Sequence, residues 1–179
     1  LGWEVTVARA FSLSGKITGG LGAAYVRHVE FDLLDQNGEY RLGDEGGISL
    51  ALDFDLGTDR KLRVDGAYIF FGTDELNGQD YIDQGNQATG ALALDLPLGG
   101  FATYWALRYT VKGDNTLYSD GTSEGAVEIS QPSGTYLFID GRLSHAVGRK
   151  VLLYAQGRYS RMDGSDYPIG ANGTSLAVG

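Results

Sequence analysis

Histidine beside carboxylates is the first arrangement in this chain that could do chemistry, because an imidazole next to a carboxylate can act as a general base. The 179 residues contain two histidines, His28 and His145, and no cysteine. His28 precedes Glu30 and Asp32 in an alternating segment, so the three side chains would share one face of a strand. We interpret His28 as a structural histidine bonded to a carboxylate, and we predict no catalytic residue and no enzyme.

A second set of charged residues combines aspartates with arginines at the polar positions of alternating segments. Its members are Asp53, Asp55, Asp65, Asp95, Asp140, Arg63, Arg108, Arg142 and Arg158. Such a set is either a charged constriction that filters ions or a network of salt bridges that fills a narrow barrel. We expect the filling network for about eight to ten strands and the filter for about twelve or more. In both cases Asp53, Asp95 and Asp140 should each have an arginine on a neighbouring strand.

Other chemistry has little support in the sequence. The net charge of −9 argues against a nucleic-acid partner. Zinc-ligand spacing, a phosphate loop and a dinucleotide fingerprint are all absent from the sequence. We therefore predict no cofactor and no metal site, and we interpret the acidic connections as a solvated face.

Strict alternation of apolar with small or polar residues predicts the strands that must position these side chains. Three such segments, at 50–57, 92–99 and 137–144, look like copies of one hairpin pattern. Repetition at near-constant spacing predicts one domain, residues 1–179, folded as an up-and-down antiparallel sheet closed into a barrel. The predicted strands cover residues 3–14, 16–34, 47–57, 61–72, 87–97, 101–112, 134–144 and 150–161, with a partial ninth from 173.

The connections between these strands alternate between short and long. The long ones, at 35–46, 73–86, 113–133 and 162–172, are rich in Asp and Glu. Asn37-Gly38 and Asn77-Gly78 are type I′ turn signals within two of them, so strands can extend into the long connections. Short turns at one end and long acidic loops at the other are typical of barrels that cross an outer membrane.

Two arrangements satisfy the alternation. A soluble ligand-binding barrel would point its apolar face inward, whereas a membrane barrel would point it at lipid. We favour the membrane barrel because the polar face has few lysines and the apolar face carries aromatic residues near strand ends, as an aromatic girdle requires. Arg9 and Arg27 lie on the apolar face, so either they are near the interface or a bulge shifts the register there. The girdle residues are Trp3, Tyr25, Tyr68, Trp105, Tyr109 and Tyr159.

On these patterns the chain resembles the Gram-negative outer-membrane β-barrel proteins as a superfamily. The resemblance covers nearly all 179 residues and rests on pattern, without a signature motif. It implies an antiparallel transmembrane barrel of eight to ten or more strands in the bacterial outer membrane, in contact with outer-membrane lipid. Proteases and lipid-A-modifying enzymes of that membrane carry His with Asp, Glu or Ser near the outer rim, which is the catalytic alternative for His28. Such barrels usually end in an aromatic residue, whereas this chain ends Leu176-Ala-Val-Gly179.

The predicted number of strands bears on how the barrel closes. Nine passes put the two ends on opposite sides, whereas single-chain bacterial barrels have an even count. We therefore predict that the terminal strands pair with missing chain or with other protein subunits, so that these residues are a fragment of a larger barrel. The expected function is a porin-like passive channel or a structural barrel. The alternatives are a module of a secretion or assembly machine, an enzyme using His28, and the soluble ligand-binding barrel.

Overall fold

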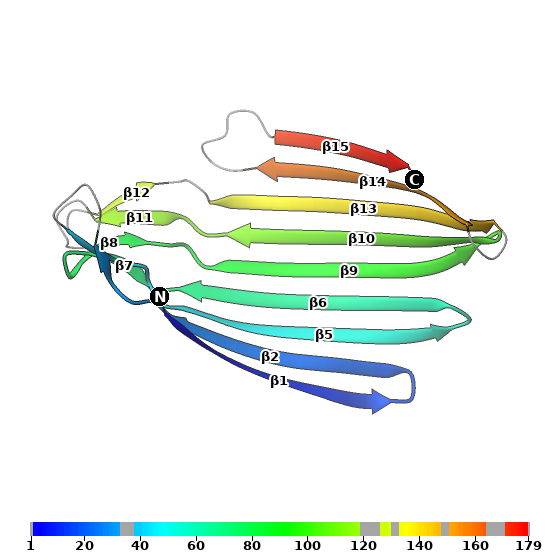
Figure 1. Ribbon diagram of the computed structural model, residues 1–179, viewed down its shortest axis with the longest axis horizontal. Helices are drawn as coiled ribbons and strands as arrows, with labels where there is room; N and C mark the ends of the chain where they lie inside the picture. Colours follow the sequence, from blue (N-terminus) through cyan, green and yellow to red (C-terminus); the bar gives the residue numbers. More distant parts are fainter. Residues whose placement is uncertain are drawn as a thin grey trace.

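The computed structural model describes residues 2–32, 38–118, 126–129, 133–147, 151–163 and 171–178. Its strands form two antiparallel sheets, one of nine strands and one of six, and the described residues include no helix (Figure 1). A membrane-spanning helix is accordingly not found among them. The all-β prediction and the antiparallel arrangement are therefore confirmed.

Successive hairpins build the nine-stranded sheet in the order β1-β2-β5-β6-β9-β10-β13-β14-β15. Seven of the eight complete strands predicted from alternation are present, with ends that differ by at most three residues, and the one predicted at 16–34 is shorter. The ninth, β15, begins two residues before the predicted start. The strands are β1 (Trp3–Ser14), β2 (Ile17–Arg27), β5 (Glu45–Gly57), β6 (Arg60–Phe71), β9 (Gln87–Leu98), β10 (Phe101–Lys112), β13 (Gly134–Val147), β14 (Val151–Asp163) and β15 (Ala171–Val178).

The described short turns lie at one end of this sheet (Figure 1). Thr58 and Asp59, between β5 and β6, have φ values of 46° and 62°. Gly99 and Gly100, between β9 and β10, have φ values of 57° and 86°. Positive φ at both central residues is the type I′ geometry, whose twist matches that of the strands it joins.

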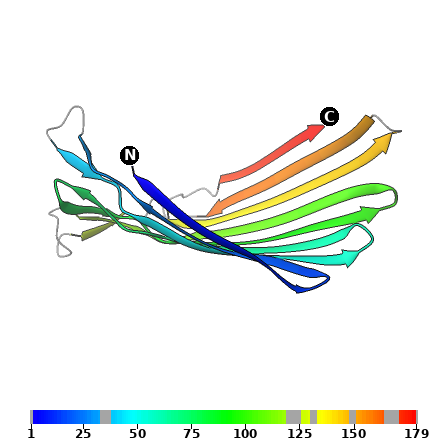
Figure 2. The ribbon, with the colours of Figure 1, turned by 60° about the horizontal axis from the view of Figure 1, so that its bottom comes forward.

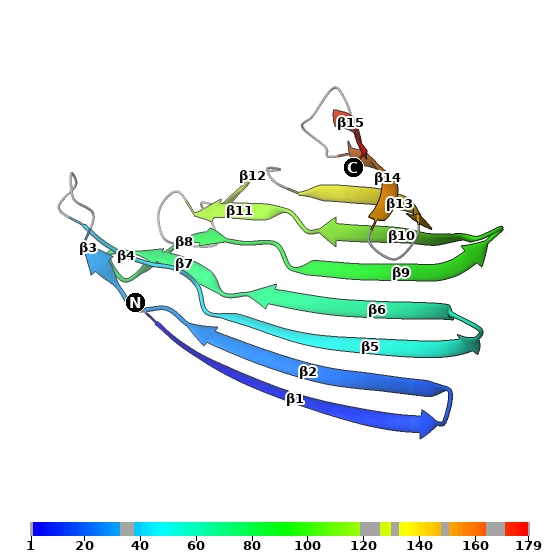
Figure 3. The same cartoon turned by 45° about the vertical axis from the view of Figure 1, so that its right-hand side comes forward.

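The six-stranded sheet lies beyond the other end of the long strands and has the order β12-β11-β8-β7-β4-β3 (Figures 1 and 3). It occupies much of what the sequence predicted as long loops. Asn77 and Gly78, with φ values of 55° and 74°, form the turn between two of its strands, as their type I′ signal predicted. Asn37, of the other predicted turn, lies outside the described residues. The strands are β3 (Phe31–Asp32), β4 (Glu39–Arg41), β7 (Thr73–Leu76), β8 (Gln79–Asp83), β11 (Asn115–Tyr118) and β12 (Ala126–Ile129).

One predicted strand, at 16–34, is wrong as a single element. The structure ends β2 at Arg27 and places β3 in the other sheet. The physical reason is local: the backbone N–H of His28 donates to the Asp44 side chain at 3.3 Å, instead of continuing the strand ladder. Alternation alone cannot locate such a break, because the side-chain pattern continues through it.

The nine-stranded sheet is curved, and β1 and β15 form its opposite edges (Figures 1 and 2). Within the described ranges β1 pairs with β2 only and β15 pairs with β14 only, so the sheet is open between those two edges. The predicted antiparallel sheet is thus present, while its closure into a barrel is not seen.

Candidate functional site

The apolar face of the nine-stranded sheet is exposed. No hydrophobic side chain among the described residues is buried, and Ile48 and Trp105 are 62% and 51% exposed. The predicted girdle residues all come from this face. Trp3, Tyr25, Tyr68, Tyr109 and Tyr159 lie in the strand halves nearer the six-stranded sheet, where the rings of Trp3 and Tyr25 are 5.6 Å apart. Trp105 lies nearer the short turns.

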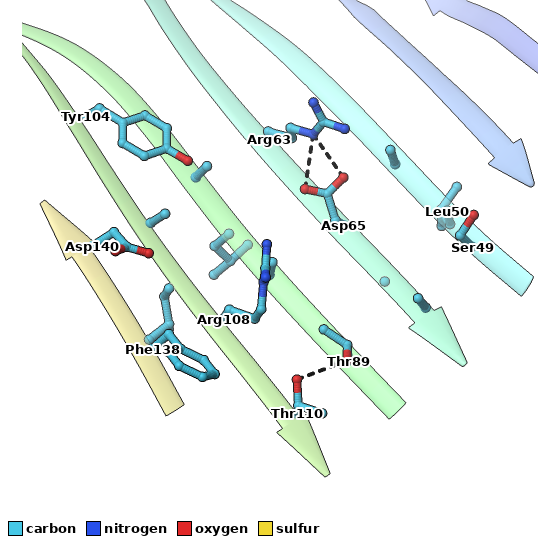
Figure 4. Close-up of a pocket in the computed structure, with 18 of the residues that line it drawn as sticks. Ser49, Leu50, Arg63, Asp65, Thr89, Tyr104, Arg108, Thr110, Phe138 and Asp140 are labelled. Atoms are coloured by element: carbon cyan, nitrogen blue, oxygen red, sulfur yellow. Dashed lines mark hydrogen bonds and ion pairs between the residues drawn. The ribbon is translucent and has the colours of Figure 1, made fainter. Parts of the chain in front are cut away.

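The opposite, polar face lines a hollow of about 1210 Å³, which we call the polar hollow (Figure 4). The charged members come from alternate positions of β6, β10, β13 and β14. Much of the floor between them is made of glycine and alanine. These small residues are Gly20, Gly22, Ala51, Ala67, Ala91, Ala93 and Ala106. Small side chains leave the space above them open.

Two of the three predicted Asp–Arg pairs form across neighbouring strands of the polar face. Arg158 Nε donates to Asp140 Oδ1 at 2.6 Å, and Arg63 Nε lies 4.0 Å from Asp53 Oδ1. Arg63 Nε also donates to both oxygens of Asp65, two residues along its own strand, at 2.9 and 3.0 Å (Figure 4). In each case the register explains the contact, because Asp53 is opposite Arg63 and Asp140 is opposite Arg158.

Asp95 is the exception to the predicted pairing. Its cross-strand neighbours are Lys61 and Tyr104, and within the described part of the chain it makes no ion pair shorter than 4.0 Å. Nearby, the Arg142 guanidinium lies 5.8 Å from the centre of the Tyr104 ring, a cation–π contact. Asp55 accepts a hydrogen bond from the Gly57 backbone N–H at 2.9 Å, at the end of β5. The charged residues at this end of the polar face are therefore less tightly paired.

Arg108 differs from the other interior arginines. Its cross-strand neighbours are Ala91 and Phe138, and it makes no ion pair with any described residue. One position nearer the six-stranded sheet on the same face, Thr89 Oγ1 and Thr110 Oγ1 are 2.9 Å apart (Figure 4). The sequence assigned Arg108 to a network of charges, but the register does not give it an opposite carboxylate.

His28 lies just beyond β2, and its described carboxylate partner is Glu45 of β5. The distance from His28 Nε2 to Glu45 Oε1 is 3.3 Å. Glu30, which the sequence placed beside it, forms no hydrogen bond or ion pair with His28 in the described part of the chain, and the Asp32 side chain is outside the described residues. A histidine bonded to a carboxylate was the structural role expected; the carboxylate comes from the neighbouring strand instead of the same one.

A row of Asp and Asn residues at the boundary between the two sheets was missed by the sequence analysis. This junction row consists of Asp44, Asp74, Asn86 and Asn115. Each uses its Oδ1 to accept a backbone N–H from the neighbouring segment. The donors are His28 at 3.3 Å, Gly43 at 2.7 Å, Phe71 at 3.1 Å and Gly85 at 3.0 Å, in the same order.

The signal for the junction row was present in the sequence, since each member follows a glycine by one or two residues. At Gly43 the reason is close backbone approach, because a Cβ there would clash with the Gly72 carbonyl oxygen. The Gly72 N–H in turn donates to the Asp44 backbone oxygen at 2.6 Å. Glycine lets neighbouring segments approach, and the following Asp or Asn satisfies the backbone donors that leave the ladder.

Asp74 is the most buried member of the junction row, at 2% exposure. Besides Gly43, it accepts hydrogen bonds from Tyr40 Oη at 2.6 Å and from Gln84 Nε2 at 3.3 Å. Burial, followed by this bond to Asp74, raises the pKa of Tyr40 well above its usual value. The hydrogen bond from Tyr25 lowers the pKa of Asp44. The row is thus a hydrogen-bonded structural element.

The described residues do not offer a metal site. Within the part of the chain that is described, His, Asp and Glu side chains do not gather in groups of three or more that could hold an ion.

A scan against protein-family models found no match to this chain, and a search of curated proteins found none either.

Proposed function

We propose that the nine-stranded sheet is part of the wall of a β-barrel in the bacterial outer membrane and that the barrel is a passive channel. The observation that carries this proposal is the arrangement of the two faces. The apolar face is exposed along its length, while the face that lines the hollow carries most of the charges of the long strands. A membrane barrel needs an apolar exterior and a polar interior.

The same observation argues against the soluble ligand-binding barrel. In such a barrel the concave face would carry the apolar side chains and form the core. Here the hollow is lined by Arg63, Asp65, Arg108 and Asp140. Leaving the apolar face in water would expose a large, mostly hydrophobic surface, which soluble monomers rarely do.

The floor of the polar hollow favours an open channel over a filled interior. A barrel plugged by its own side chains needs bulky residues there, whereas this floor is largely glycine and alanine. The ion pairs Arg63–Asp65 and Arg158–Asp140 neutralise two of the arginines on this wall. The charges therefore suit a lining that water and small solutes can pass.

The open edges set a condition on this proposal. In lipid, an unpaired strand edge leaves backbone donors and acceptors without water, at a cost of several kcal/mol each. The outer edges of β1 and β15 must therefore be paired in the membrane, with each other, with additional strands of the chain or with another subunit. The third arrangement would suit a module of a larger assembly.

Arg9 needs a location in the proposed barrel, since it is on the apolar face of the edge strand β1. It is opposite Leu21, and the β1–β2 register is regular from Trp3 to Ser12, so a bulge does not redirect it. A long arginine side chain can extend its charged end to the headgroup region while its methylenes stay in lipid. We assign Arg9 this role.

Labels at adjacent positions of β10 test the proposal. The chain has no cysteine, so Leu107→Cys and Ala106→Cys each give one labelling site, on the apolar and the polar face. In lipid vesicles, a spin label at 107 should be accessible to oxygen and one at 106 to a water-soluble relaxation agent. The opposite pattern, or equal access of both labels to the aqueous agent, would exclude a membrane-spanning wall.

Conductance tests the channel separately from the membrane location. The full-length protein inserted in a planar bilayer should give discrete, ohmic current steps. If the labels report lipid at 107 but the inserted protein carries no current, the barrel is structural and the channel proposal fails.

A further inference from the structure

We infer that Arg108 and the threonine pair beside it form a binding site for small organic carboxylates in the polar hollow. The inference rests on the proposed function, to which it adds a class of solute. It starts from the contrast between Arg108 and the two arginines that are held by aspartate. Arg63 is opposite Asp53, and Arg158 is opposite Asp140.

The neighbours of Arg108 leave its positive charge uncompensated. Ala91 and Phe138 are opposite it, and Ala106 and Thr110 are its same-face neighbours along β10. The carboxylate of Asp140, diagonal to it on β13, is bonded to Arg158 at 2.6 Å. The Asp65 carboxylate, two strands away at the same level, is bonded to Arg63. Both carboxylates therefore already have an arginine partner other than Arg108.

The space around Arg108 has the size and polarity that a carboxylate needs. Ala91, Ala93 and Ala106 form the floor of the hollow beside it. A guanidinium presents paired N–H donors that match both oxygens of a carboxylate. The two hydroxyl groups of Thr89 and Thr110 share one hydrogen bond, so one hydroxyl proton stays available for a ligand.

Phe138 provides the apolar side of the site. It is opposite Arg108 on β13 and lines the same hollow (Figure 4). A ligand with a charged carboxylate and a flat apolar body would match the guanidinium and the ring together. Arg142, in contrast, already has the Tyr104 ring beside it. Arg108 is thus the interior arginine best placed to take an organic anion.

The test uses the full-length protein in detergent micelles, with nitrogen-15 arginine and benzoate as the probe. The Arg108 Nε–H resonance, identified by its loss in Arg108→Gln, should shift and saturate with benzoate but not with neutral benzamide. Ala91→Asp supplies the opposite carboxylate that Arg108 lacks, and it should weaken benzoate binding about tenfold or more. Arg60→Gln, which removes a charge at a short turn, should leave binding unchanged.

Arg108→Lys gives a second measurement that does not depend on folding of the Ala91→Asp variant. It keeps the charge but loses the paired donors, so it should also weaken benzoate binding, followed here by the broadening of the benzoate proton resonances because the Arg108 signal is absent. An absent or unsaturable shift in the wild type would overturn the site. Undiminished binding in a folded Ala91→Asp variant would overturn it as well.

Conductance distinguishes this inference from the proposed channel. In a KCl gradient, the wild type should prefer anions and Ala91→Asp should lose that preference. Conductance without benzoate binding would overturn the site and leave the channel in place. Benzoate binding without conductance would support the site and remove the channel.

Discussion

The two sheets of this protein are built from segments that follow one another along the chain, but different hydrogen bonds hold each sheet together. The nine-stranded sheet has strands of 8 to 14 residues joined by long, regular backbone ladders. The six-stranded sheet has strands of 2 to 5 residues, with as few as two paired positions between neighbours. The junction row separates them. Side chains replace ladder bonds at the place where the long strands end.

This contrast teaches what each region requires of its sequence. Long ladders need only sustained alternation, and in the proposed barrel they satisfy every backbone group within the bilayer. Short strands bury little apolar surface, so they depend on particular residues such as Asp74 and Tyr40. The effect of a substitution on stability should therefore depend on which face it lies on in the larger sheet. In the smaller sheet it should depend on whether a particular hydrogen bond is lost.

The largest effect should come from placing a charge on the apolar face. Leu50 lies in the middle of β5, and Leu50→Arg should lower the free energy of unfolding in lipid vesicles by about 2–4 kcal/mol. The neighbouring Ser49→Arg, on the polar face, is the matched control and should change it little. Denaturant titration followed by tryptophan fluorescence measures both. Equal losses for the two variants would show that the faces do not differ in their surroundings.

Removing the central acceptor of the junction row should have the next largest effect. Asp74→Ala leaves the Gly43 N–H, the Tyr40 hydroxyl and the Gln84 amide without their acceptor, at a cost of about 1–3 kcal/mol. Hydrogen exchange should accelerate in β4, β7 and β8 and stay slow in β9 and β10. Asp80→Ala, at an exposed site of the same sheet, is the control. Acceleration spread evenly over both sheets would contradict separate support of the two regions.

Substitutions in the hairpin turns should change the stability in opposite directions in the two sheets. The turn at Asn77-Gly78 already has residues suited to positive φ, so Gly78→Ala should destabilise by about 1 kcal/mol. Thr58 and Asp59 adopt positive φ at a steric cost, and the double variant Thr58→Asn, Asp59→Gly should be more stable by about 0.5–1 kcal/mol. Denaturation midpoints measure both changes. Loss of stability in the double variant would mean that the threonine or aspartate side chain has a further role.

The smallest expected effect is on how stability depends on acid pH, through the carboxylate of Asp44. The pKa of Asp44 is lowered by its bond from Tyr25, so its charged form contributes stability above the ordinary value of 3.8. That contribution is lost as the pH falls through the lowered folded-state pKa. Asp44→Asn should therefore reduce the stability difference between neutral pH and about pH 2, seen as a shallower change of the denaturation midpoint. An unchanged pH profile would exclude Asp44 as a contributor.

Alternation was sufficient to predict most of the larger sheet, because a face that repeats every second residue is a local property. The Asn77-Gly78 turn was likewise readable, since few residues tolerate positive φ. The break after Arg27 was not, because it depends on Asp44, a residue distant in sequence. The partner of His28 was missed for the same reason: Glu45 reaches it from the next strand.

The sequence by itself determined the period of the strands, their order along the chain and the division of each strand into an apolar and a polar face. Tertiary structure decided which residues meet across strands. Asp140 meets Arg158, Asp95 makes no comparable pair among the described residues, and Arg108 is opposite Ala91 and Phe138. The physical reason is register, because the position of one strand along the next is set by turns and backbone hydrogen bonds.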